Sequence, residues 1–536
     1  MKKLLKRLCS AMVAAVMVMT MAPAAFAADG GAQFQNGPYL LAPKTNSMVV
    51  VWESTEKVSA TIAYGTDESK LCDPIKVEID ADAPDFKGSK MNLFHYKLDN
   101  LTPGTRYYYE VKLEGGATCK ASFKTLSEKP DQIRLITLSD SHIFATRAEL
   151  DQAIKEFDPD LLLHCGDMVE GTGAQAEQFS FWFQGKVEND YIHSYPVVYS
   201  SGNHDQGGVY FNTYVYSIQD EEYGAEVEGD SSFNYAGLHI ITMNSNPWGL
   251  FQMNSEATGQ KADAATIKTI DNAMNWLKKD LATDAAKNAD FRLIFMHHPV
   301  SDAYTKRYIP AVIEPGKVDL LLSGHTHSYA RAVSSNPAVG AGTIYLTHQD
   351  ARTYNKKGDF FYITSTPGSG VLDVKNYGAT AAGQESKVAN ETLVAKDKQQ
   401  LSWSDISITP STVLYNGEVT VTAKVTNNGK GLAAAVIPVV DNGTTRYLYK
   451  FEDGIVTLDP GKSATLTGTL RMEKLGTHTL KLADKTVSVN VKYRPATFDY
   501  TNIRTQQGNG KTSDMNSNIL HIKADVVNIG NDAGTG

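Results

Sequence analysis

The organising segment of this chain is Leu161-Leu162-Leu163-His164-Cys165-Gly166-Asp167, a short apolar run that ends at a glycine and a carboxylate. An apolar run of this length, bounded by glycine, is typical of a buried β-strand. Ligands of open α/β sheets bind beyond the carboxyl ends of the strands. The sequence therefore predicts that Asp167 lies at the mouth of a sheet.

Four further segments have the same form, in which an apolar run is followed by Asp, Asn or His. They are Ile133–Ser139 before Asp140-Ser141-His142, Pro196–Ser200 before Gly202-Asn203-His204-Asp205, Phe291–Met296 before His297-His298-Pro299, and Val318–Leu322 before Gly324-His325-Thr326-His327. One such ending is routine, but five in one chain form a constellation that predicts a shared site. The candidate metal ligands in it are Asp140, His142, Asp167, Asn203, His297, His325 and His327.

This mixture of oxygen and nitrogen ligands suits iron, manganese or zinc better than calcium or magnesium. Seven protein ligands are too many for one ion, so the set predicts two ions that share a bridging carboxylate. Asp167 is the candidate bridge, because it is central in the set. Both side chains of Asp140-x-His142 can face one ion, whereas the rings of His325-x-His327 could each take a different ion.

A two-metal site of this kind makes hydroxide from water near neutral pH and holds a phosphoryl group for in-line attack. What the ligand set lacks is an acid for the leaving group. His204, which follows the candidate ligand Asn203, is placed for that role, and Asp205 is able to orient its ring. The predicted catalytic residues are therefore His204 and Asp205.

Three residues near these motifs are expected to have supporting parts. His164 lies inside a predicted strand and is expected in the core or behind a ligand. His298 is expected to be structural or to line the pocket. Glu170 is expected either to face solvent or to support a ligand.

Residues 1–27 have the pattern of a secretory signal peptide. Four basic residues at positions 2–7 precede an apolar stretch to about Met21, and Ala25-Phe26-Ala27 offers a cleavage site. A transmembrane anchor is the alternative, but the run is short and is followed by Pro23 and small residues. No other apolar run is long enough to span a bilayer, so we expect a secreted or cell-surface protein.

The balance of charge excludes some partners. The net charge of −9 becomes −13 without residues 1–27, because these hold four basic and no acidic groups. An acidic chain without a basic tract is a poor candidate for binding nucleic acid or an anionic membrane. The balance says little about a small anionic substrate, because bound metal ions would dominate the local field.

The 536 residues predict several domains. Residues 33–126 form short strands separated by turn signals, which indicates an all-β sandwich. Residues 131–385 alternate strand and helix patterns, as in an α/β domain, and the clearest helix has Asp263 as its candidate N-cap. The predicted apolar face of this helix consists of Ile267, Ile270, Met274, Leu277 and Leu281. Residues 386–402 are weakly patterned and are interpreted as a linker.

Strand patterns return from Trp403 onward, and residues 403–495 indicate a second β-sandwich. Residues 496–536 contain the start of a repeat, because Leu520–Gly530 matches Val419–Gly429 at an offset of 101 residues. So little chain follows this strand that one copy cannot close a sandwich. The copy is therefore expected either to be truncated or to complete a sheet elsewhere.

The cysteines give limited information about disulfides. Cys9 leaves with the signal peptide, and Cys165 is expected to be inert core. Cys72 and Cys119 flank one predicted β domain, and in an exported protein they could be paired or free.

The five motifs resemble those of calcineurin-like metallophosphoesterases, which carry Asp-x-His, Gly-Asp, Gly-Asn-His-Asp, His-x-Pro and Gly-His-x-His in this order over residues 133–332. The resemblance implies a four-layer α/β domain and places His204 at the acid position. It places Asp140, His142, Asp167 and His327 on a first metal. It places Asp167, Asn203, His297 and His325 on a second metal.

The two flanking regions also resemble known domains. Gly37-Pro38-Tyr39-Leu40 and Ser47–Trp52 resemble the N-terminal domain of purple acid phosphatases, and Leu101–Tyr107 with Trp52 looks like a fibronectin type III sandwich. The C-terminal repeat resembles the CARDB-type immunoglobulin-like modules of bacterial surface proteins. This last resemblance makes a cell-wall or surface polymer a candidate partner.

The sequence departs from purple acid phosphatases at two linked positions. That family has Asp-x-Gly and Gly-Asp-x-x-Tyr, with the tyrosine on ferric iron, but the corresponding positions here hold His142 and Glu170. The resemblance therefore implies that His142 supplies the ligand that tyrosine would supply. We expect no tyrosinate-to-iron charge-transfer band, and manganese or zinc become plausible in place of ferric iron.

These features predict a secreted phosphoesterase that hydrolyses a small phosphate ester by metal-bound hydroxide. A phosphomonoester is favoured, because the resemblance to acid phosphatases spans two domains. One alternative is a phosphodiesterase acting on nucleotides or on wall or lipid phosphodiesters. The other is a surface-binding protein with a non-catalytic phosphoesterase scaffold, which the unbroken ligand set argues against.

Overall fold

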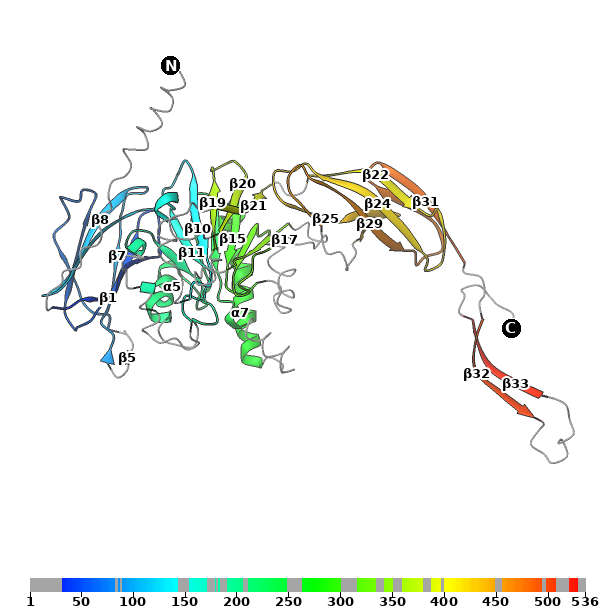
Figure 1. Ribbon diagram of the computed structural model, residues 1–536, viewed down its shortest axis with the longest axis horizontal. Helices are drawn as coiled ribbons and strands as arrows, with labels where there is room; N and C mark the ends of the chain where they lie inside the picture. The colour runs from blue at the N-terminus through cyan, green and yellow to red at the C-terminus, as the bar shows by residue number, and fades with distance from the viewer. Residues whose placement is uncertain are drawn as a thin grey trace, which may run out of the picture. The chain divides into compact units, whose positions relative to one another are not determined.

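The computed structural model describes residues 31–81, 85–86, 89–142, 154–170, 179, 182–183, 190–205, 211–247, 263–299, 316–333, 342–349, 359–378, 387–396, 400–448, 456–493, 498–507 and 520–528. The predicted signal peptide, residues 1–27, lies outside the described residues. The chain divides into two compact units (Figure 1). The first contains residues up to 397 together with 430–432, and the second contains 398–429 and the residues from 433 onward.

The first unit begins with the predicted β-sandwich. One sheet has the order β1-β2-β7 and the other has the order β4-β3-β8-β9. The strands are β1 (Phe34–Leu41), β2 (Met48–Ser54), β3 (Ala60–Gly65), β4 (Ile75–Val77), β7 (Leu93–Leu98), β8 (Arg106–Leu113) and β9 (Thr118–Lys124), with a separate pair β5 (Asp85–Phe86) and β6 (Ser89–Lys90). Trp52 is fully buried and stacks on Phe94, with 5.3 Å between ring centroids. Cys72 is exposed and Cys119 is buried, and both are free thiols.

Two six-stranded sheets form the centre of the first unit (Figure 1). The first has the order β12-β11-β10-β19-β20-β21, and the second has the order β13-β14-β15-β16-β18-β17. The strands of the first sheet are β10 (Ile133–Leu138), β11 (Leu161–His164), β12 (Val197–Tyr199), β19 (Asp359–Ser365), β20 (Val371–Gly378) and β21 (Lys387–Ala395). Those of the second are β13 (Ser231–Tyr235), β14 (Leu238–Thr242), β15 (Phe291–Phe295), β16 (Leu320–Ser323), β17 (Ala330–Val333) and β18 (Ile344–Thr347).

The five apolar runs that precede the candidate ligands are all strands, and they are parallel within each sheet. In the first sheet β10 runs parallel to β11 and β11 parallel to β12. In the second sheet β15 runs parallel to β14 and to β16. Every residue of β11 and of β16 is buried, as expected for strands covered on both faces.

The longest described helix is α7 (Ala264–Asp280), and it begins as the sequence predicts. The Asp263 carboxylate caps it by accepting a hydrogen bond from the Thr266 N–H at 2.7 Å. One member of the predicted apolar face is wrong, because Ile267 is 39% exposed. Ile267 lies in the first turn of the helix, whereas the buried face begins at Ile270. Further helices are η1 (Asp190–His193), η2 (Asn212–Tyr216), α5 (Ser217–Tyr223) and α8 (Asp284–Asn288).

The sandwich and the central sheets share one hydrophobic core. Tyr39 from β1 packs on Phe183 with ring centroids 4.4 Å apart, and its hydroxyl donates to the Tyr214 carbonyl at 2.8 Å. The Tyr214 hydroxyl in turn donates to the buried Glu53 carboxylate of β2 at 3.0 Å. The N-terminal sandwich is therefore a fixed part of the first unit.

The expected linker at 386–402 needs correction. Residues 387–395 form β21, which pairs antiparallel with β20 at the edge of the first central sheet. Val394 is fully buried and pairs with Leu372. The segment looked weakly patterned because an edge strand has one neighbouring strand and tolerates polar residues.

The second unit contains the predicted C-terminal β-sandwich, which starts at Leu401. Its sheets have the orders β22-β24-β29 and β23-β31-β30-β26-β27, with a separate pair β25-β28. The strands are β22 (Leu401–Thr409), β23 (Thr412–Leu414), β24 (Glu418–Asn427), β25 (Ala433–Ala435), β26 (Ile437–Asp441), β27 (Thr444–Leu448), β28 (Val456–Leu458), β29 (Ser463–Arg471), β30 (Gly476–Leu482) and β31 (Lys485–Lys492). Strand β24 alternates buried and solvent-facing residues, which is the pattern that the sequence predicts.

The sequence repeat corresponds to a repeated strand pair. β32 (Phe498–Gln507) pairs with β33 (Leu520–Asn528) as a two-stranded sheet. The pair Phe498↔Asn528 corresponds to Leu401↔Asn427 of β22 and β24. The register shifts between Ser404 and Ser407 in β22 and between Thr501 and Arg504 in β32. Both copies therefore form the same strand pair with a bulge at the same place.

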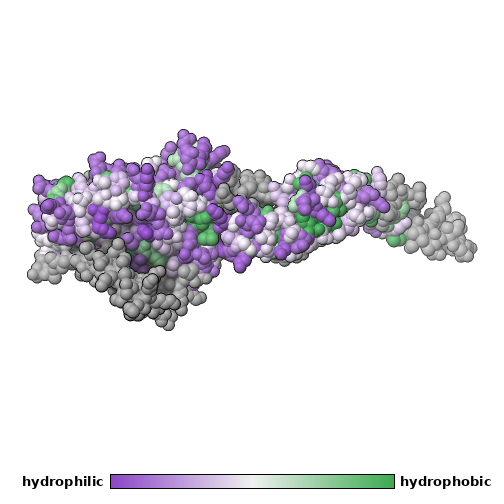
Figure 2. Space-filling model, turned by 90° about the horizontal axis from the view of Figure 1, so that it is seen from above, coloured by the Kyte–Doolittle hydropathy of each residue, from purple (hydrophilic) through white to green (hydrophobic). Residues whose placement is uncertain are grey.

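The described surface is largely polar. Figure 2 shows a face on which hydrophilic residues predominate and hydrophobic residues form small separate groups. Among the residues that the structure describes, no helix combines the length and apolar character needed to cross a membrane.

Candidate metal centre

The seven predicted ligands lie in loops that leave the carboxyl ends of five parallel strands. Loops after β10, β11 and β12 carry Asp140, His142, Asp167 and Asn203, and loops after β15 and β16 carry His297, His325 and His327. The two sheets thus direct their ligand-bearing loops to one place. This follows from the parallel order, because parallel strands present the same ends at one edge.

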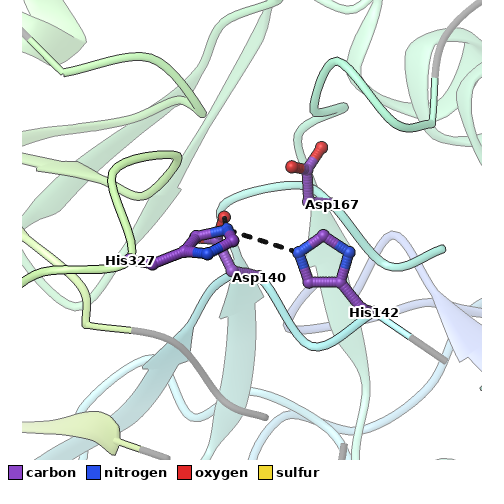
Figure 3. Close-up of side chains that lie close together, drawn as sticks. All are labelled: Asp140, His142, Asp167 and His327. Atoms are coloured by element: carbon purple, nitrogen blue, oxygen red, sulfur yellow. Dashed lines mark hydrogen bonds and ion pairs between the residues drawn. The ribbon is translucent and has the colours of Figure 1, made fainter. Parts of the chain in front are cut away.

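The first group consists of Asp140, His142, Asp167 and His327, whose ligand atoms all lie within 4.8 Å of one another (Figure 3). His327 Nε2 is 3.1 Å from Asp140 Oδ1 and 3.4 Å from His142 Nε2. The Asp140 carboxylate also accepts a hydrogen bond from the His325 backbone N–H at 3.0 Å. Two imidazole nitrogens and two carboxylates therefore converge on one small volume.

The second group consists of Asp167, His297 and His325, and it shares Asp167 with the first. His297 Nε2 lies 3.1 Å from Asp167 Oδ2. The Asn203 side-chain oxygen joins this group, at 3.1 Å from His297 Nε2 and 2.8 Å from His325 Nδ1. Asp167 therefore belongs to both groups, as predicted for a bridging carboxylate.

The backbone is strained where it carries ligands. Asp140, His142, Asp167, His325 and His327 all have φ between 44° and 70°, in the left-handed region that non-glycine residues rarely adopt. Such strain persists only where the surrounding structure holds it, and it is concentrated at functional sites.

Two glycines allow the loops to approach each other. A side chain at Gly202 would overlap the Asp167 carboxylate, and one at Gly324 would overlap Ser139 and the Asp140 carboxylate. The motifs therefore need glycine because the ligand carboxylates occupy the space that a Cβ would fill.

The charges of the site fit metal ions. Asp140 and Asp167 are both buried, and each lies beside a histidine ring and accepts a hydrogen bond from a backbone N–H group. Burial alone would raise the pKa of Asp140, but the hydrogen bond from His327 and the charge of His297 outweigh it and hold this pKa well below its usual value. Buried carboxylates held ionised beside imidazoles form a donor set that two divalent ions would neutralise.

His204 lies beside both groups and is partly exposed. Its ring is 5.0 Å from the His142 ring, and its Nε2 is 4.0 Å from Asp167 Oδ2. Its Nδ1 bonds the Glu170 backbone carbonyl. Because the carbonyl can only accept, Nδ1 carries a proton, and Nε2 is the atom that can exchange a proton with a substrate.

The role predicted for Asp205 is wrong, because its carboxylate does not orient the His204 ring. Asp205 is buried and accepts hydrogen bonds from the backbone N–H groups of Asp167, Met168 and Gly202 at 2.7 to 2.8 Å. Burial, followed by the charge of Asp167, raises the pKa of Asp205 to about 7. Asp205 therefore holds together the two loops that carry Asp167 and Asn203.

His164 has a similar supporting place. Ser141 Oγ is 2.9 Å from its Nε2, and the Gly166 N–H donates to its Nδ1 at 3.1 Å. Burial lowers the pKa of His164 to about 3, so the ring is neutral and bridges the first two ligand loops. His298 is buried behind the second group, where its Nδ1 lies 2.9 Å from Ser245 Oγ.

Family comparison identifies the two domains of the first unit. Residues 133–329 match the calcineurin-like phosphoesterase family, and residues 38–125 match the purple acid phosphatase N-terminal domain. The chain contains a calcineurin-like phosphoesterase domain. This confirms both recognised families, the phosphoesterase class and the fold predicted for the central domain. No matched family covers the C-terminal module, so its CARDB-type resemblance stays a prediction.

Several solved structures show weak similarity to this phosphoesterase. PhoD is 12% identical with a TM-score of 0.46, and the match covers 67% of this chain and 90% of PhoD. A conserved uncharacterized protein and predicted phosphoesterase from Streptococcus pneumoniae TIGR4 is 11% identical with a TM-score of 0.24, covering 49% and 98%. Vps29 from Chaetomium thermophilum is 9% identical with a TM-score of 0.25, covering 49% and 98%. These scores are too low to carry an argument, and no curated protein matches the chain.

The geometry brings all seven predicted ligands together with His204. Sequence reasoning left the place of Glu170 open, and the structure shows its carboxylate against His142 at 2.9 Å. The only signal in the sequence was its position, three residues after Asp167 in the same loop.

Proposed function

We propose that this phosphoesterase is an exported enzyme that hydrolyses phosphomonoesters with the help of two metal ions. The observation that carries the proposal is the pair of ligand groups sharing Asp167, with His204 beside both. The preference for monoesters is supported by the purple acid phosphatase N-terminal domain, which packs on the phosphoesterase domain through a common core. Export is supported by the signal-peptide pattern of residues 1–27.

Asp140, His142, Asp167 and His327 would hold one ion, and Asp167, Asn203, His297 and His325 would hold the other. Bound there, the ions would supply Lewis acidity and an activated water near neutral pH. The donor set of carboxylate, amide and imidazole suits manganese, zinc or iron. We therefore propose that the two ions are drawn from these three metals.

His204 would act on the leaving group. When the ring carries two protons, the Nδ1 proton stays in the hydrogen bond to the Glu170 carbonyl. The proton on Nε2 is the one that can be donated. His204 Nε2 would therefore give its proton to the ester oxygen as the bond to phosphorus breaks.

The test compares p-nitrophenyl phosphate with bis(p-nitrophenyl) phosphate as substrates, together with metal analysis. We expect about two metals per chain, faster turnover of the monoester, and loss of both activities in Asp167→Asn. Asp290→Asn is the matched control, because this surface carboxylate pairs with Lys396. Faster turnover of the diester would replace the monoester assignment by the phosphodiesterase alternative. No hydrolysis after loading with manganese, zinc or iron would overturn the proposed enzyme.

A cell-wall or surface polymer is the proposed partner of the C-terminal module, residues 401–493. The support is its sandwich architecture and the strand pair that repeats after it. The full-length protein should sediment with isolated cell walls, whereas a chain ending at residue 397 should remain in solution. Equal sedimentation of both chains would remove this partner from the proposal.

A further inference from the structure

Glu170 contacts two histidines of the site through two different groups. Its carboxylate oxygen Oε2 lies 2.9 Å from His142 Nδ1. Its backbone carbonyl accepts a hydrogen bond from His204 Nδ1. One residue therefore faces both a candidate metal ligand and the candidate proton donor.

We propose that the Glu170 carboxylate is a positioning residue that orients His142 for the first metal ion. The inference rests on the proposed two-metal function and adds a residue to it. Glu170 does not belong to either ligand group, so it acts through His142.

The neighbours of the His142 ring determine which of its nitrogens carries the proton. Nδ1 lies 3.2 Å from the Val169 carbonyl, to which it is hydrogen-bonded, and 2.9 Å from the Glu170 carboxylate, with which it forms an ion-pair contact. The Val169 carbonyl accepts the hydrogen bond of Nδ1 and can only accept, so Nδ1 carries the proton and Nε2 of the neutral ring presents a lone pair, while the Glu170 carboxylate lies beside the same nitrogen as a charge contact. Nε2 is also the atom near the other ligands, at 3.4 Å from His327 Nε2.

The Glu170 carboxylate lies on the side of the His142 ring opposite the ligating nitrogen. A carboxylate behind a ligating imidazole fixes the ring orientation and raises the basicity of the ligating nitrogen. The Glu170 side chain is 40% exposed, yet its Oε2 atom is buried against the ring. The side chain as a whole therefore keeps part of its hydration, whereas the buried Oε2 has the His142 ring beside it in place of water.

The two contacts of Glu170 can be separated by mutation. A side-chain substitution removes the carboxylate from His142 and leaves the backbone carbonyl at His204. Glu170→Ala should therefore weaken metal binding at the first group and leave the second group, with Asn203, His297 and His325, intact. Loss of such a supporting carboxylate typically weakens metal affinity by about 10- to 100-fold.

The experiment is a titration of the metal-free full chain with manganese. Calorimetry measures the binding, and electron paramagnetic resonance detects the bound ion. We expect two sites in the wild type, and in Glu170→Ala one site unchanged with the other about 10- to 100-fold weaker. Glu170→Gln should be intermediate, because it keeps the shape of the side chain beside His142 Nδ1 and removes only its charge. Glu226→Gln is the matched control, since it removes an exposed carboxylate that pairs with Lys279.

Activity provides a second measurement that separates positioning from proton donation. With saturating manganese, Glu170→Ala should regain kcat to within a few-fold of wild type, whereas His204→Ala should not. Two wild-type sites and an unchanged affinity in Glu170→Ala would overturn this inference alone. Absence of two sites in the wild type would overturn the metal centre and this inference together. Circular dichroism spectra matching the wild type will show that each variant is folded.

Discussion

Protons should compete with metal ions at His297, and the structure sets the size of this competition. In the metal-free protein His297 is buried, its Nδ1 is 2.9 Å from the Cys165 carbonyl, and its Nε2 is 3.1 Å from Asp167 Oδ2. Burial would lower the pKa of His297, but the charge of Asp167 and the hydrogen bond to it raise the value to about 9. At neutral pH the ring therefore carries a proton on Nε2, the atom that faces the second ligand group.

A metal ion at the second group must displace this proton, because a histidine binds a metal through an unprotonated nitrogen. Each pH unit below about 9 should then weaken binding tenfold, which gives about 100-fold at pH 7 and about 1,000-fold at pH 6 relative to alkaline pH. The metal-free fold has the opposite dependence. The folded pKa of His297 lies above its ordinary value of 6.5, so the stability it contributes is complete below about 6.5 and is lost as the pH rises through about 9.

The assay is manganese calorimetry between pH 6 and pH 9 in pairs of buffers with different ionisation enthalpies. We expect release of about one proton per chain at pH 7 from the weaker site, and an affinity that rises tenfold per pH unit. His95→Gln is the control, because this histidine lies on the surface and pairs with Asp80. A pH-independent affinity without proton release would refute the reasoning.

Three further predictions concern residues around the site and the domain interface. Gly202→Ala should displace the Asp167 carboxylate and lower metal content from about two ions to fewer than one, which elemental analysis measures; full metal content would contradict the packing argument. Asp205→Asn turns an amide N–H₂ toward backbone N–H donors, so it should reduce the free energy of unfolding by about 2–4 kcal/mol, measured by denaturant titration. A change below about 0.5 kcal/mol would show that these hydrogen bonds are dispensable. Glu53 has its pKa raised by burial, so the stability linked to its protonation is present below its ordinary pKa of 4.5 and lost as the pH rises. Glu53→Gln should therefore be at least as stable as wild type at pH 7, and a less stable variant at that pH would argue that the ionised group is needed.

The ligand set could be predicted from the sequence because its signal is local. Each ligand follows a short apolar run within a few residues. Such a run forms a buried strand, because a strand in a sheet that is covered on both faces is apolar on both sides. Gly166, Gly202 and Gly324 mark the tight approaches in the same short motifs. The order of the motifs was also sufficient to indicate the phosphoesterase family.

Contacts between distant parts of the chain were decided only by the tertiary structure. The carboxylate of Asp205 was expected at the neighbouring His204 ring, but it binds backbone N–H groups of the Asp167 loop, 37 and 38 residues away. Glu170 meets His142 across 28 residues, a pairing that neither motif implies. Strand β21 lacks a clear pattern of its own and forms because β20 offers it a partner. Local residue patterns determine which segments become strands and which side chains end them, whereas the pairing of loops depends on how two sheets are brought together.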